Sequence, residues 1–376
     1  EDLAKSYFKA MNNIAAITHL EIGYRSKPTN EYFGESTGFN QINDKVSFDT
    51  FLVNFNTSFS SSKLGMTTFF MNYRDVNYSY ENLVDIDNNY NYESIIDENF
   101  SFGLNYLFKK ENYILDFQFE SMLTGDVEGS LIGAGLLLNI NSDSNIKFSF
   151  INSDNSPDYN YIVNNSSYLN YNWNNFFKNI NTTRYTLNFS SDKLFKFNFE
   201  FNNISNHTYF VKDVSGTVLP VQESNNLSVF KMNISKKFSF KKFVIDNRVQ
   251  FQKAGDESLG IINIPELILR NTFYYQNELF KKALFLQTGF TFNYFSEFYM
   301  NSYDPLLSEF YVQNNKLIGN FPRIDFFVNA KIQQTRIFLK AEHINSSFTG
   351  YNYYSAPNYP YRDFSIRFGL VWNFFM

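Results

Sequence analysis

The chain has 376 residues, no cysteine and a formal net charge of −5, and it contains 46 phenylalanines and 27 tyrosines. Aromatic residues make up 20% of the chain, although its mean hydropathy is −0.33. This combination is unusual for a soluble globular protein and typical of a sheet with one apolar face and polar loops. The absence of cysteine excludes a disulfide framework and a thiolate metal site. Mixed charges give no reason to expect nucleic acid, and no run of about 18 apolar residues predicts a transmembrane helix.

The predicted elements are strands, because apolar and polar residues alternate and successive side chains of a strand point to opposite faces. The alternation is plainest in residues 194–202, where phenylalanines separate Lys196 from Glu200. In chain order we predict spans over residues 14–25, 46–59, 63–74, 100–108, 113–122, 131–140, 146–152, 183–189, 194–202, 227–235, 243–252, 267–276, 283–295, 323–332, 336–344 and 363–376.

One predicted span changes its facing midway. In residues 46–59 the apolar positions shift from Phe48 and Leu52 to Val53 and Phe55. An extra residue in one strand is the simplest way to move side chains to the other face. We therefore predict a β-bulge in this span.

So many one-sided strands need something to cover their apolar faces, and the sequence predicts no layer of helices. A closed sheet in a membrane satisfies its own backbone and turns its apolar side to lipid. We therefore predict an all-β fold, a transmembrane antiparallel up-and-down β-barrel of about 16 strands. Residues 14–376 are expected to form the barrel, and residues 1–13 a periplasmic N-terminal tail.

The predicted connections alternate in length. Short ones are expected near residues 60–63, 109–112, 141–144, 190–193, 237–241, 278–282 and 333–335. Barrels of the bacterial outer membrane have short periplasmic turns and long extracellular loops, which predicts that both termini are periplasmic. Longer connections are expected after Arg25, Arg74, Met122, Asn152, Asn202, Gln252, Phe295 and Ile344.

The last third of the chain contains a series of motifs, in order PEL at 265–267, RNTFYY at 270–275, LFKKAL at 279–284, YDP at 303–305, FYVQ at 310–313, IGNFP at 318–322, DFFVNAK at 325–331, AEH at 341–343, YYSAPNYP at 353–360 and RFGLVWNFF at 367–375. These motifs resemble those of the putative porin family of Bacteroidota, a family of outer-membrane barrels. The resemblance is strongest over residues 264–376 and looser over residues 31–263, and it implies a porin-like outer-membrane protein. Members of that family are usually longer, with N-terminal sequence that has no counterpart here, so further strands are expected if the chain is a fragment.

Charged residues on the polar side of the predicted strands are candidates for lining an aqueous channel. A barrel of about 16–18 strands leaves room for one, and rings of charge set ion preference. The alternative is that these charges pair across neighbouring strands and only keep the wall polar. The candidates are Asp116, Glu120, Lys196, Glu200, Asp246, Arg248, Arg270, Arg323, Asp325, Lys331, Arg336, Lys340, Glu342 and Arg367.

The sequence offers no convincing catalytic, cofactor or metal site. The acidic run beginning at Asp85 resembles a calcium loop, but Tyr90 and Ile96 stand where that loop needs glycine and a bidentate glutamate. His19, His207 and His343 are too scattered to suggest a ligand set. No Gly-x-Ser-x-Gly nucleophile motif is present. We expect no enzymatic activity and no cofactor.

The connection over residues 153–181 is rich in aromatic residues and asparagine, with Tyr159, Tyr168 and Trp173 among them. Such a loop either folds inward as a constriction, docks a surface lipoprotein or glycan, or forms an interfacial girdle with a loose tip. The same alternatives apply to residues 351–361, which Pro357 and Pro360 stiffen.

Two functions follow from this sequence. The first is an outer-membrane channel for passive diffusion of small hydrophilic solutes. The second is a barrel that acts as a scaffold or receptor for surface lipoproteins or other partners, with its lumen blocked by aromatic loops. Energy-coupled uptake is third, because such transporters have about 22 strands and a plug. Outer-membrane lipid is the expected surrounding in each case.

Overall fold

The computed structural model describes residues 18–23, 44–80, 85–86, 89–90, 94–125, 129–168, 170–348 and 353–373. The predicted tail, residues 1–13, and most of the acidic run after Asp85 lie outside these residues. No helix in the described part of the chain is long and apolar enough to cross a membrane.

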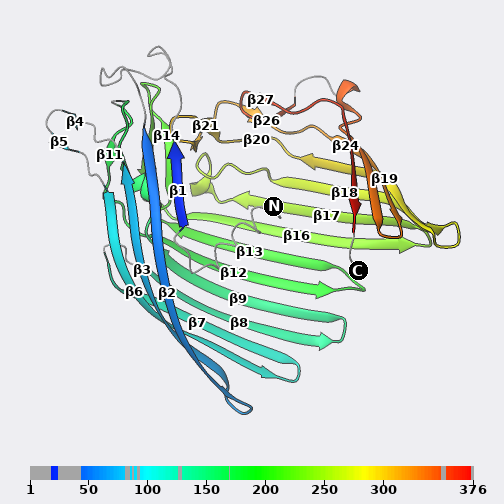
Figure 1. The fold of residues 1–376 in the computed structure, drawn as a ribbon, viewed down its shortest axis with the longest axis horizontal. Helices are drawn as coiled ribbons and strands as arrows, with labels where there is room; N and C mark the ends of the chain where they lie inside the picture. The colour runs from blue at the N-terminus through cyan, green and yellow to red at the C-terminus, as the bar shows by residue number, and fades with distance from the viewer. Residues whose placement is uncertain are drawn as a thin grey trace. The chain divides into compact units, whose positions relative to one another are not determined.

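The main element is a sheet of sixteen strands, in which each strand lies next to its sequence neighbours in the sheet (Figure 1). Each of the predicted spans overlaps one of these strands, so the predicted all-β architecture is confirmed. The order begins at β1 and ends at β28. The strands are β1 (Thr18–Gly23), β2 (Lys45–Ser61), β3 (Gly65–Tyr80), β6 (Ser94–Lys110), β7 (Tyr113–Thr124), β8 (Gly129–Asn141), β9 (Ser144–Asn155), β12 (Ile180–Ser191), β13 (Lys196–Ser205), β16 (Leu227–Phe240), β17 (Phe243–Ala254), β18 (Leu267–Leu279), β19 (Leu284–Phe295), β24 (Arg323–Ile332), β25 (Thr335–Glu342) and β28 (Ser365–Trp372).

Short elements lie in the longer connections. They are the strands β4 (Asp85–Ile86), β5 (Asn89–Tyr90), β10 (Val163–Asn164), β11 (Trp173–Asn174), β14 (Thr208–Lys212), β15 (Val218–Gln222), β20 (Phe298–Tyr299), β21 (Ser302–Asp304), β22 (Glu309–Val312), β23 (Leu317–Ile318), β26 (Tyr354–Ala356) and β27 (Tyr359–Pro360), the helix α3 (Tyr159–Ile162) and the 3-10 turns Asp256–Ser258 and Ser346–Phe348.

The chain divides into two compact units. Unit 1 holds the described residues of Glu1–Leu137, Ser149–Arg184 and Asn203–Asn226. Unit 2 holds those of Leu138–Phe148, Tyr185–Asn202 and Leu227–Met376.

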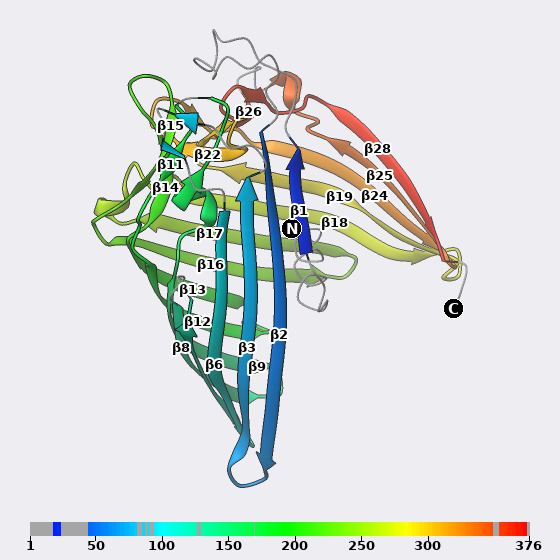
Figure 2. The ribbon, with the colours of Figure 1, turned by 60° about the vertical axis from the view of Figure 1, so that its left-hand side comes forward.

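In unit 1 the long strands β2 and β3 form one antiparallel hairpin that runs to a short turn (Figure 2). Their register is unbroken from the Val46–Tyr80 pair to the Ser61–Gly65 pair, so the predicted bulge in residues 46–59 is wrong. Phe48 and Leu52 instead stay on the face opposite Val53. The register shifts between β6 and β7, at Phe100, where no bulge was predicted.

Phe48 keeps its polar-side position because it has aromatic neighbours there. Its ring lies 6.4 Å from that of Tyr78 on β3 and 6.0 Å from that of Tyr159, which belongs to the connection between β9 and β12, measured between centroids. The apolar character that suggested a bulge therefore comes from packing against a loop.

The two faces of unit 1 differ as the alternation predicts. On the apolar face Phe55 and Met71 are cross-strand partners with exposed fractions of 67% and 55%. On the other face Asn54 pairs with Asn72, and their side-chain amides are hydrogen-bonded at 2.5 Å. Large apolar side chains this exposed, in a contiguous row, indicate contact with an apolar medium.

Unit 2 has the same two faces. Phe290 and Phe326 are partners on the apolar face of β19 and β24, with ring centroids 5.2 Å apart. The neighbouring residue Asp325 is on the opposite face and is 2% exposed. Asn247 and Asn271 stand on the apolar face, where the Asn271 amide donates to Asn247 Oδ1 at 2.7 Å. Polar groups in an apolar setting are tolerated when they are hydrogen-bonded.

The short turns lie where they were predicted. Glu111, Lys241 and Gln333 have φ values of 36°, 53° and 50° at the tight turns β6–β7, β16–β17 and β24–β25. Left-handed residues of this kind match the twist of hairpin strands. The connection after Met122, however, was predicted to be long and is short, because β7 ends at Thr124 and β8 begins at Gly129.

Candidate functional site

The candidate charges of β17 to β28 share one face of unit 2. The register places Asp246 opposite Thr272, Thr272 opposite Thr291, and Thr291 opposite Asp325. Residues directly opposite on antiparallel strands point to the same side. The same register puts all of the following on this polar face: Asp246, Arg248, Arg270, Arg323, Asp325, Lys331, Arg336, Lys340, Glu342 and Arg367.

At one end of this face the charges neutralise one another. The buried Asp325 carboxylate lies 3.6 Å from Arg323 Nε and 3.2 Å from Lys340 Nζ, and it accepts a hydrogen bond from the His343 backbone amide at 2.9 Å. The next carboxylate, that of Glu342, has one oxygen 2.8 Å from Lys340 Nζ and the other 3.1 Å from Arg367 Nε. These residues form a continuous ion-pair chain across β24, β25 and β28, as the wall-chemistry alternative requires.

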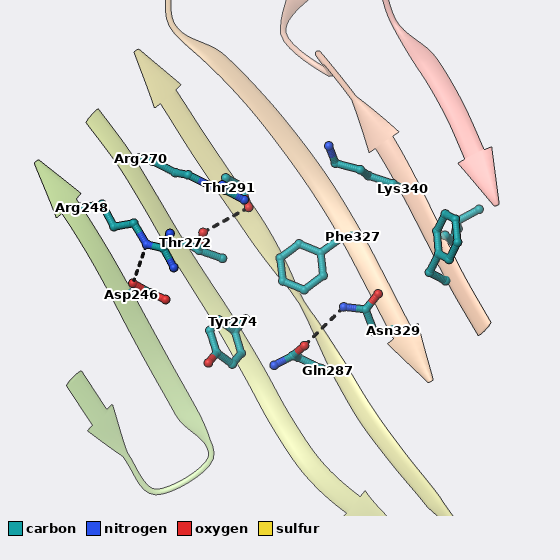
Figure 3. Close-up of a pocket in the computed structure, with 12 residues that line it drawn as sticks. Asp246, Arg248, Arg270, Thr272, Tyr274, Gln287, Thr291, Phe327, Asn329 and Lys340 are labelled. Atoms are coloured by element: carbon teal, nitrogen blue, oxygen red, sulfur yellow. Dashed lines mark hydrogen bonds and ion pairs between the residues drawn. The ribbon is translucent and has the colours of Figure 1, made fainter. Parts of the chain in front are cut away.

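Beside that chain the polar face contains a cavity of about 330 Å³ (Figure 3). Hydroxyls and amides from successive strands hydrogen-bond one another along it: Thr272 with Thr291 at 3.3 Å, and Asn329 donating to Gln287 at 3.3 Å. The residues that line it are Asp246, Arg248, Arg270, Thr272, Tyr274, Gln287, Thr291, Phe327, Asn329, Phe338, Leu339 and Lys340.

The two arginines that line the cavity face each other directly. Arg248 on β17 and Arg270 on β18 are cross-strand partners, and both are exposed. Arg248 Nε is 3.7 Å from a carboxylate oxygen of Asp246. Like charges placed opposite each other destabilise a sheet, so this arrangement concentrates positive charge at one wall of the cavity.

The remaining candidates of unit 2 lie elsewhere. Lys331 and Arg336 are opposite each other next to the β24–β25 turn and are exposed. On β13, Lys196 Nζ is 3.8 Å from Asp192, and Glu200 accepts a hydrogen bond from Asn202 at 2.8 Å. None of these four residues lines the cavity.

In unit 1 the two candidate carboxylates also have neighbours on the polar face. Glu120 accepts hydrogen bonds from Ser101 at 2.7 Å and Asn72 at 3.0 Å. Asp116 covers Gly135, where an added β-carbon would lie 2.5 Å from its carboxylate oxygens. Gly135 therefore lies on the same face as Asp116.

The aromatic loop of residues 153–181 is folded rather than loose. Tyr168, Tyr171 and Trp173 are 1%, 4% and 8% exposed. The Trp173 indole donates to the Asn160 carbonyl at 3.0 Å, and Tyr161 stacks on Phe210 with centroids 4.6 Å apart. These contacts give the loop a small core that it shares with Phe210 of β14.

The loop is fastened to the polar side of β2 and β3. The carboxylate of Asp44, just before β2, accepts hydrogen bonds from the Ser166 hydroxyl at 2.5 Å and from the Ser167 amide at 2.9 Å. Tyr159 packs on Tyr78 with centroids 5.4 Å apart. The described residues of the loop therefore pack against the polar face of β2 and β3 in their own unit.

Several lining residues carry no signal strong enough for sequence reasoning to select them. Gln287, Thr291 and Asn329 fall on the polar parity of their strands, but neutral side chains of that kind occur along every strand. Tyr274, Phe327 and Phe338 are aromatic residues on a polar face, and only the register brings them beside the arginines. Asp44 was missed because it precedes its strand.

The family model described as "putative porin" matches residues 10–376 of the chain. The resemblance seen in the last third therefore extends over nearly the whole sequence. None of the curated proteins compared with the chain matches it.

Solved structures of outer-membrane β-barrel receptors are similar in fold. The siderophore receptor PirA from Acinetobacter baumannii has a TM-score of 0.64 at 9% identity, covering 94% of this chain and 58% of its own. The FrpB iron transporter from Neisseria meningitidis (F5-1 variant) has a TM-score of 0.65 at 10% identity, covering 94% and 59%. A variant of the ferric enterobactin receptor PfeA from Pseudomonas aeruginosa, in complex with enterobactin, has a TM-score of 0.58 at 9% identity, covering 81% and 50%.

The chain thus spans 50–59% of the length of these proteins. At such identities the likeness shows a shared fold and nothing about ligands.

Proposed function

Because the chain belongs to the family described as putative porin, we propose that it is an outer-membrane channel through which small hydrophilic solutes diffuse passively. The observation that carries this proposal is the consistent two-faced sheet, whose apolar side is exposed and whose opposite side bears charges of both signs. A barrel with such walls turns its apolar face to lipid and its polar face to a water-filled lumen.

The charge pattern of the polar face supports this proposal. Charges of both signs along it create a transverse field that orients dipolar solutes, and lining charges set preference among ions. The ion-pair chain around Asp325 fixes several of these charges in place. We further propose that the termini are periplasmic, since the short turns and the chain ends belong to the same side in barrels of this class.

Planar-bilayer recording tests the channel directly. Full-length, refolded protein should produce discrete conductance steps that scale with salt concentration and need no energy source. Protein that is folded by circular dichroism and resists dissociation from lipid, yet gives no conductance at any concentration, would refute passive diffusion.

A second candidate is a receptor or scaffold with a blocked lumen. It is supported by the folded aromatic loop on the polar side of unit 1, and by the receptor role of structurally similar proteins such as PirA. It predicts a stoichiometric surface lipoprotein that co-purifies in mild detergent. It also predicts that deleting the loop tip, residues 164–172, raises conductance from zero, whereas an already open channel would change only in step size.

A further inference from the structure

The cavity of unit 2 contains an arrangement that costs stability unless something compensates it. Arg248 and Arg270 are direct cross-strand partners on the polar face. Side chains at such positions start about 5 Å apart, and like charges there are unfavourable. A sheet that only needed a polar wall would be more stable with a neutral residue at either position.

The nearby carboxylates do not fully neutralise the positive charge of Arg248 and Arg270. Asp246 is the one acidic residue among those lining the cavity, and the residue directly opposite it on β16 is another cation, Lys237. Its contact with Arg248 is 3.7 Å long. The next carboxylates, Asp325 and Glu342, are already engaged by Lys340, as described above.

The groups around the arginines suit a solute with an anionic head and a ring. A guanidinium fork matches the geometry of carboxylate and phosphate oxygens and binds them bidentately. Thr272, Thr291 and Asn329 offer hydroxyl and amide groups along the floor, and Phe327 presents an aromatic ring among them (Figure 3). Sugar rings and flat organic rings stack on such surfaces. The cavity volume of about 330 Å³ is at the small end of ligand sites.

We propose that this cavity is a binding site for small ring-bearing oxyanions, carboxylates or phosphates, held by Arg248 and Arg270 with the ring against Phe327. The inference rests on the proposed function and names its solute class: the channel selects organic anions of about monosaccharide size at this point of its wall. The anion supplies the negative charge that the arginine pair lacks.

Titration calorimetry on full-length protein in detergent tests the site without requiring conductance. The probes are glucose 6-phosphate and galacturonate, each compared with its neutral parent sugar, glucose and galactose. We expect each acid to bind at least tenfold more tightly than its parent, and Arg270→Gln to weaken acid binding about tenfold, the loss of one charge-assisted contact. Binding of only one acid assigns the site to carboxylate or to phosphate.

Arg336→Gln is the matched control, because Arg336 is an exposed cation on the same face outside the cavity. It should leave binding unchanged. Equal losses in the two variants would mean that only bulk positive charge matters and would overturn the proposal, as would equal binding of acids and neutral sugars.

A stability measurement guards against a variant that simply misfolds. In buffer free of oxyanions, Arg270→Gln should be at least as stable as the wild type, because it removes a like-charge pair. Glucose 6-phosphate should raise the melting temperature of the wild type and not that of the variant. Binding without conductance would refute the channel and keep the site; conductance without acid binding would refute the site alone.

Discussion

At the scale of single residues, the clearest energetic feature is the buried carboxylate of Asp325. Its two oxygens are held by Arg323, Lys340 and the His343 amide, with 2% of the residue exposed. Removing one member of a buried ion-pair network leaves its partners with uncompensated charge, which costs more than the pair itself contributes.

Asp325→Ala should therefore lower the free energy of unfolding by about 3–5 kcal/mol. Lys193→Ala is the control, because its pair with Asp143 is solvent-exposed, with 80% of the Lys193 side chain accessible. Exposed pairs contribute only about 0–1 kcal/mol. Urea unfolding of the protein in lipid vesicles measures both, and equal effects would contradict the assigned role of Asp325.

The sequence largely predicted which face of the sheet each residue lies on, but it did not predict which residues contact one another across neighbouring strands. Alternation alone put Asp325, Lys340 and Glu342 on the polar side. Which of them would meet depends on cross-strand register, which a single sequence does not specify. The contact between Arg248 and Arg270 could not be predicted for the same reason, because the two arginines belong to different predicted spans.

At the scale of elements, the aromatic loop of unit 1 behaves as a folded part with a defined anchor. Asp44 accepts from both Ser166 and Ser167, each of which is at most 9% exposed. Hydrogen bonds to a charged group contribute more than neutral ones, so this carboxylate holds the loop against the strands.

Asp44→Ala should lower the free energy needed to open the loop by about 2 kcal/mol. The amide exchange rates over residues 163–174 should then rise roughly thirtyfold. Hydrogen–deuterium exchange measures it. Asp213→Ala is the matched control, because Asp213 accepts similar bonds from Ser215 and the Thr217 amide within its own hairpin. Unchanged exchange in the Asp44 variant would show that the aromatic contacts alone hold the loop.

The connection between β13 and β14 carries a pH-sensitive group. Burial lowers the pKa of His207, and Glu223 opposes this by raising it. The folded state therefore favours neutral imidazole more than the unfolded chain does. The contribution of His207 to folding stability is therefore complete above the pKa of the unfolded chain, about 6.5. This contribution is lost as the pH falls through that value towards the lower pKa of the folded state.

We expect the β14–β15 hairpin to lose protection from amide exchange between pH 7.5 and 5, after correction for intrinsic rates. His207→Gln should flatten this dependence, since glutamine keeps a polar group without titrating. A loss of protection that is identical in the variant would assign the pH effect to another group.

The mistaken bulge in β2 belongs to this scale as well. Apolar residues at Phe48 and Leu52 looked like a change of facing because sequence alternation assumes that every apolar side chain seeks the same side. The packing of Tyr159 against Phe48 shows that a loop can cover part of the polar face. Long connections, whose path a sequence does not give, are where alternation fails.

At the scale of the whole molecule, the number, order and facing of the strands in the described sheet were predictable, because the two-residue period repeats in nearly every segment. The family match and the similar structures agree with that architecture. The solute site was not predictable, because it depends on residues from β17 to β25 meeting across the sheet.

A charge placed on the apolar face should be costly. Val249, in the middle of β17, is 36% exposed on that face and pairs with Ile234 and Leu269. Val249→Arg should destabilise the protein in lipid by about 2–4 kcal/mol. Gln250→Arg, one residue along on the polar face, should cost far less, and a reversed order measured by unfolding from vesicles would contradict the assignment of the faces.

The most direct test of the central claim is an accessibility scan of β17. Single cysteines at each position from Phe243 to Gln252 can be spin-labelled without background, because the chain has no cysteine. In bilayers, labels at Phe243, Ile245, Val249 and Phe251 should collide with dissolved oxygen, and labels at Asp246, Arg248 and Gln250 with a water-soluble nickel chelate. That two-residue alternation is the result the lipid-facing sheet predicts; equal exposure of both sets to the nickel chelate would contradict it.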